Sequence, residues 1–114
     1  MTMTKAELAT AVLRRLAVIG GNEAADASDL DVVTDAIDSI YPQLRKLGLA
    51  PFSVDSIDSW AERPMVKIVA AEIGPEFGHT DPMKNEFEAK KGRQELAEQM
   101  TAQRRRMPTK ARFF

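Results

Sequence analysis

The C-terminal quarter of the chain, from Lys84 to Phe114, is too highly charged to supply a hydrophobic core. It holds nine basic and four acidic residues, a net charge of +5, whereas residues 1–83 hold seven basic and thirteen acidic residues, a net charge of −6. Only about 80 residues therefore remain to bury one another, and a unit of that size often gains stability from association with other subunits. The pattern predicts a small domain with a basic arm that works within an assembly.

The spacing of apolar residues predicts an all-α fold: a small bundle of about four helices with a long C-terminal helix and an extended C-terminal tail. A first helix is expected over residues 5–18, because Thr4 and Glu7 form a capping box. Gly20 and Gly21 are expected to end it, because glycine adopts the left-handed conformation without a Cβ clash. No segment shows the alternating pattern of a strand.

Two further helices are expected in the middle of the chain. The second begins after Ser28 and ends at Gly48, and Pro42 is expected to kink or split it. After a short turn through Trp60, residues 64–73 form a third helix that is apolar on nearly all sides, so it should be the central element. The predicted core consists of apolar residues at helical spacing, namely Leu8, Val12, Leu16, Val33, Ile37, Ile40, Leu44, Trp60, Ile68, Val69 and Ile73.

A fourth helix is expected over residues 82–106, with Thr80 or Asp81 as its cap and Pro82 in its first turn. Met83 and Phe87 are expected to pack on the bundle, and the helix to project beyond Lys90. The predicted organisation is therefore a helical bundle over residues 1–80, followed by a projecting helix and docking tail over residues 81–114.

The sequence contains no set of residues that indicates catalysis. There is no cysteine, and the single histidine, His79, lies in a polar loop without a nucleophile or paired carboxylate at an interpretable spacing. Five aspartates, at positions 26, 29, 31, 35 and 38, lack the spacing of a calcium loop and are interpreted as a solvated face. We expect no enzyme activity, no metal and no cofactor.

The end of the chain leaves three interpretations open for Arg104, Arg105 and Arg106. They are a solvated helix end, a weak and salt-sensitive contact with nucleic acid, or a docking site for an acidic protein partner. The last interpretation draws on Phe113 and Phe114, because an exposed apolar tip usually docks on something else. No segment resembles a signal peptide or a membrane span, so we expect synthesis in the cytoplasm.

The order of these segments resembles the head-to-tail adaptor (tail accessory factor) family of tailed bacteriophages. The likeness covers nearly the whole chain. It lies in the first helix with Thr4–Leu16, the second with Val33–Ile40, the segment from Trp60 through Val69–Gly78, and the long charged helix that closes on Arg105-Arg106-Met107-Pro108. The chain is shorter than the members from short-tailed phages, which leaves tail type open and casts doubt on any additional activity of the longer relatives.

The resemblance implies a structural protein of the virion at the head–tail interface. In that family, subunits form a homo-oligomeric ring, here expected to be a dodecamer, between the portal protein and a downstream tail or stopper protein. Genomic DNA passes through the channel without sequence-specific binding. The residues expected to dock on the portal are Leu96, Met100, Arg104, Arg105, Arg106, Met107, Pro108, Phe113 and Phe114. The alternative is a small helical DNA-binding protein with a basic C-terminal arm.

Overall fold

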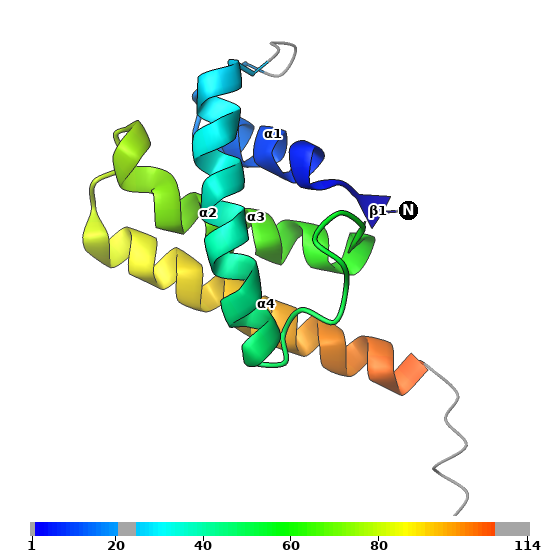
Figure 1. The fold of residues 1–114 in the computed structure, drawn as a ribbon. Helices are drawn as coiled ribbons and strands as arrows, with labels where there is room; N and C mark the ends of the chain where they lie inside the picture. Colours follow the sequence, from blue (N-terminus) through cyan, green and yellow to red (C-terminus); the bar gives the residue numbers. More distant parts are fainter. Residues whose placement is uncertain (1, 21–24, 107–114) are drawn as a thin grey trace, which may run out of the picture.

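The computed structural model describes residues 2–20 and 25–106, and for Arg104–Arg106 it describes the backbone alone. Within these residues the chain forms four α-helices (Figure 1): α1 (Lys5–Arg15), α2 (Ala27–Lys46), α3 (Glu62–Ile73) and α4 (Pro82–Arg106). Two 3₁₀ turns flank α3, η1 (Ser59–Ala61) and η2 (Gly74–Phe77). The all-α prediction is confirmed, and the predicted bounds of the fourth helix agree with α4.

Helix α3 is the central element, as its apolar composition predicted. Met65 and Val69 are fully buried, and Ile68 and Ile73 nearly so. One side of α3 contacts α1 and α2, and its contact with α4 is the most extensive between any two elements in the described part of the chain (Figure 1). A core shared by three neighbours explains why α3 has no continuous polar face.

The two ends of α1 are fixed by local hydrogen bonds. At the start, the Glu7 N–H donates to Thr4 Oγ1 (3.2 Å) and the Thr4 N–H to Glu7 Oε1 (3.0 Å), which confirms the predicted capping box. At the end, the prediction was wrong: α1 ends at Arg15, before Gly20. Ala17 takes the left-handed conformation (φ 60°), and the Val18 N–H donates to the Leu13 carbonyl (3.0 Å). This pair of features is a Schellman motif, which ends a helix by satisfying its last carbonyls.

Helix α2 ends in the same motif, with glycine at the left-handed position. Gly48 has φ 76°, and the Leu49 N–H donates to the Leu44 carbonyl at 2.8 Å. At the other end, Asp26 rather than Ser28 is the N-cap residue. Pro42 does not split the helix, which continues to Lys46. Pro42 is exposed, so water can hydrate the carbonyl that it leaves without a helical donor.

A two-stranded antiparallel ladder, absent from the sequence prediction, joins the N-terminus to the loop before α3. Strand β1 (Thr2–Met3) pairs with β2 (Ile57–Asp58), with Thr2 opposite Asp58 and Met3 opposite Ile57. The ladder places Ile57 in the core, where it is fully buried. Nearby, the Lys5 ammonium lies 2.9 Å from Asp38 Oδ1, joining α1 to α2, and this hydrogen bond raises the pKa of Lys5.

The predicted core is confirmed at every position except Trp60, which is only partly buried. Its ring and that of Phe52 form a T-shaped pair at a centroid distance of 5.8 Å. Phe52, Ile57, Met65 and Leu96 are buried as well, although the sequence analysis did not place them in the core.

Candidate interaction surface of the C-terminal helix

Helix α4 begins at a cap supplied by Asp81. Its Oδ1 accepts hydrogen bonds from the N–H groups of Met83 (3.1 Å) and Lys84 (3.3 Å). These two N–H groups have no partner within the helix, so the aspartate satisfies them and also lies at the positive end of the helix dipole. The predicted cap and the position of Pro82 in the first turn are therefore confirmed.

Gly92 lets α4 lie unusually close to α3. A Cβ atom at this position would lie 2.7 Å from Cγ1 of Ile68 and 3.1 Å from the carbonyl oxygen of Pro64. At the other end of α3, a Cβ atom at Gly74 would lie 3.2 Å from Asn85 Oδ1, so the two helices run antiparallel. Gly92 is thus a packing contact between two helices, a role that the sequence analysis did not predict.

The expectation that the helix projects beyond Lys90 is wrong. Leu96 is fully buried and Met100 is 8% exposed, so α4 belongs to the bundle at least as far as Met100. An ion pair between Lys67 and Glu95 links α4 to α3, and Arg15 Nη2 lies 3.0 Å from Glu88 Oε2, which links α4 to α1. Glu88 and Glu95 thus form ion pairs with neighbouring helices, while Leu96 and Met100 of the same helix are buried.

Met83 and Phe87 were expected to pack on the bundle, and this prediction is wrong. They are 81% and 60% exposed, respectively, and they lie one turn apart at the start of α4. Apolar side chains in such a position leave a small unpartnered patch near one end of the molecule. These are the functional candidates that the sequence analysis missed.

The residues predicted to dock on a portal fall into three groups. Leu96 and Met100 fill the core of their own chain, so they have little surface to offer a partner. Arg104, Arg105 and Arg106 form the last residues of α4. Met107, Pro108, Phe113 and Phe114 lie outside the described residues. Helix α4 thus connects two buried residues, Leu96 and Met100, to the arginine run.

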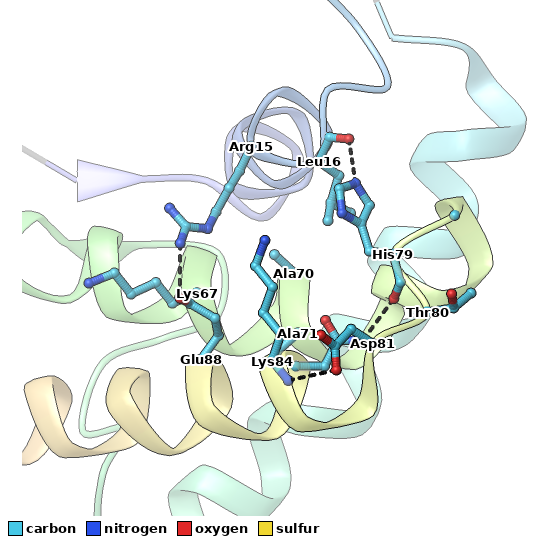
Figure 2. A pocket seen from close by; sticks show the side chains of 12 residues that line it. Arg15, Leu16, Lys67, Ala70, Ala71, His79, Thr80, Asp81, Lys84 and Glu88 are labelled. Carbon is cyan, nitrogen blue, oxygen red and sulfur yellow. Dashed lines mark hydrogen bonds and ion pairs between the residues drawn. The ribbon is translucent and has the colours of Figure 1, made fainter.

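A cleft of about 460 Å³ lies where the end of α1 meets α3 and the start of α4 (Figure 2). The Arg15–Glu88 ion pair crosses it, and a His79 ring nitrogen lies 2.9 Å from the Leu16 carbonyl oxygen. The Asn85 amide donates to the His79 carbonyl at 2.8 Å. The His79 contact joins the α3–α4 connection to the end of α1, the ion pair joins α4 to α1, and the Asn85 hydrogen bond joins α4 to the connection. The polar groups around the cleft therefore hold the fold together.

Within residues 2–20 and 25–106, no three histidine, cysteine, aspartate or glutamate side chains come together in a way that suits a metal ion. Asp38, one of the clustered aspartates, instead pairs with Lys5. In the same part of the chain, no helix is both long and apolar enough to cross a membrane.

Comparisons with protein-family models, with curated proteins and with solved structures gave no match to this chain.

Proposed function

We propose that this chain is a non-catalytic structural protein of a bacteriophage virion. It forms a homo-oligomeric ring, a dodecamer by resemblance, between the portal protein and a downstream tail or stopper protein. The observation that carries the proposal is helix α4, which is held in the bundle by Leu96 and Met100 and ends in the arginine run. A helix anchored in this way carries the arginine run at its far end, beyond its last buried side chain.

The docking segment in this proposal is shorter than the sequence analysis expected. It consists of Arg104–Met107, Pro108 and the aromatic pair Phe113 and Phe114. Leu96 and Met100 serve instead to hold α4 in place, because their side chains are buried within the chain. Portal docking then combines the charge of the arginines with the apolar area of the two phenylalanines.

The charge distribution supports a channel role for the bundle. Residues 1–103, which include the packed part of α4, hold 11 basic and 17 acidic residues, a net charge of −6. An acidic wall repels DNA phosphates, so genomic DNA would slide past without sequence-specific binding. The basic segment from Lys84 to Phe114, with its net charge of +5, favours the alternative of a small DNA-binding protein.

Two measurements test the proposal. Native mass spectrometry of the purified particle should find a ring of copies bound to portal protein, and a stoichiometry of one or two copies per particle contradicts it. The second measurement is the salt dependence of duplex DNA binding by the isolated protein. Micromolar affinity that falls steeply with salt supports the DNA-binding alternative, whereas weak binding without sequence preference supports the adaptor.

A further inference from the structure

A groove of about 420 Å³ runs between α2 and the end of α3. Its apolar residues are Val32 and Ala36 from α2 and Ile73 from α3, and all three are buried or half-buried. Three exposed carboxylates, those of Asp35, Glu72 and Glu76, line the same groove. The groove thus offers both apolar surface and negative charge to an occupant.

No described residue neutralises these carboxylates. The ion pairs within residues 2–20 and 25–106 join Lys5 to Asp38, Arg15 to Glu88 and Lys67 to Glu95, and none involves the groove. A basic segment that also carries apolar residues is complementary to this combination of negative charge and apolar surface. The chain contains one such segment, Arg104–Phe114, in which five basic residues accompany Met107, Pro108 and two phenylalanines.

The three arginines at the end of α4, Arg104–Arg106, cannot reach the groove of their own chain. Gly74, at the groove end of α3, lies beside Asn85 of α4. From Asn85 to Arg104 the helix rises by about 28 Å, and to Arg106 by about 31 Å, at about 1.5 Å per residue. Even fully extended, the six residues from Met107 to Arg112 span at most about 22 Å. Figure 1 shows the two ends of α4 on opposite sides of the molecule.

We infer that the groove receives the basic C-terminal segment of a second copy of this chain. The contact is head-to-tail: the segment of one copy enters the groove of the next, so each copy uses two different surfaces. Such a contact closes into a ring when the rotation between copies permits. The inference rests on the proposed ring and identifies the surfaces that would join its subunits in the absence of portal, before the same segment docks there.

The occupant is tested with a fluorescent, N-acetylated peptide of residues 104–114 titrated onto the full chain. We expect binding that weakens with salt, and the variant Glu72→Arg with Glu76→Arg should bind at least about tenfold more weakly. The matched control, Glu86→Arg with Glu98→Arg, changes two exposed carboxylates of α4 by the same charge and should bind as the wild type does. Should the arginine variant unfold by circular dichroism, the glutamine substitutions at the same two positions replace it. Equal binding by groove and control variants, or no binding to wild type at a protein concentration on the order of 1 mM, overturns the inference.

A charge-swap experiment shows that the partner is a second copy. The groove variant has a basic groove and a basic segment, and the variant Arg104→Glu, Arg105→Glu, Arg106→Glu has an acidic groove and a segment of lowered charge. At protein concentrations above the dissociation constant of the peptide, each variant alone should sediment as a monomer. Their mixture should associate, because the basic segment of the groove variant can then enter the acidic groove of the other variant. A mixture that remains monomeric contradicts the head-to-tail contact.

The two proposals fail separately. If peptide binding is absent but particles contain the ring bound to portal, the groove inference is wrong and the adaptor proposal stands. If the peptide binds the groove but particles lack the chain, the adaptor proposal is wrong and the contact between copies stands.

Discussion

The residues that follow the ends of α1 and α2 show how one methyl group changes the energetic cost of ending a helix. Ala17 and Gly48 both follow a helix, both take the left-handed conformation, and both belong to a Schellman motif with the same hydrogen bonds. Alanine pays a steric cost there that glycine does not, because its Cβ approaches the following carbonyl oxygen. The end of α1 is therefore strained where the end of α2 is not.

The two positions give a matched pair of substitutions. Ala17→Gly should stabilise the protein by about 0.5–1.5 kcal/mol, and Gly48→Ala should destabilise it by about 1 kcal/mol. Gly48→Ala causes no steric clash with other residues, since a Cβ atom at Gly48 would meet nothing within 4 Å. Urea unfolding of both variants measures the two differences, and shifts of the same sign would contradict this account.

Gly92 has a different role from these helix ends, because it is required for close packing rather than for backbone conformation. Gly92→Ala adds a methyl group whose carbon would lie 2.7 Å from Ile68 Cγ1 and 3.1 Å from the Pro64 carbonyl oxygen. The gain in helix propensity, about 1 kcal/mol, is smaller than the cost of forcing α3 and α4 apart. We expect a net loss of about 1–2 kcal/mol in the free energy of unfolding. A melting temperature equal to or above that of the wild type would refute the close contact.

At the scale of helices, α4 shows where sequence reasoning succeeded and where it failed. The start of α4 was predicted correctly from Asp81 and Pro82, because helix capping depends on residues that are neighbours in the sequence. Its orientation was missed, although the spacing carried the answer. Phe87 and Leu96 are nine residues apart, which is about two and a half turns at about 3.6 residues per turn, so they lie on opposite faces of the helix. One helix cannot bury both against the same bundle.

This difference between the faces of α4 is testable by truncating one side chain on each. Leu96→Ala removes a fully buried side chain and should cost about 2–5 kcal/mol. Phe87→Ala, the control on the opposite face, should change stability by less than about 0.5 kcal/mol, because its ring is 60% exposed. Chemical denaturation compares them directly, and similar losses in both variants would show that α4 is packed differently.

Features that depend on distant parts of the chain were not predictable from local pattern. The β1–β2 ladder is two residues long, too short to show alternation, and its partners are separated by more than 50 residues. The end of α1 was misplaced because two glycines lay just beyond an alanine that adopts the unusual conformation instead. The core of α1, α2 and α3 was predicted well, since periodic apolar residues on several helices must face one another.

At the scale of the whole molecule, the separation of charge corresponds to a separation of tasks. Side chains that hold the fold together extend along α4 to Met100, whereas the last three basic residues of α4 follow the final buried contact. A chain that ends at Gln103 should therefore keep its helical circular dichroism and melt within a few degrees of the full chain. It should also lose portal binding. Full affinity in this truncated chain, measured by co-purification with portal protein, would remove the docking role of the tail.

The antiparallel packing of α3 and α4 also determines how this protein bears mechanical load. Tension that a partner applies at Arg106 along the axis of α4 is one such load. Because Leu96, Met100 and the Lys67–Glu95 ion pair lie along that axis, they are loaded in shear and must break together rather than one after another. The close contact at Gly92 adds an interlock that resists sliding. A partner pulling along this axis would thus load the contacts between α3 and α4 simultaneously, so a high force would be needed to separate the two helices.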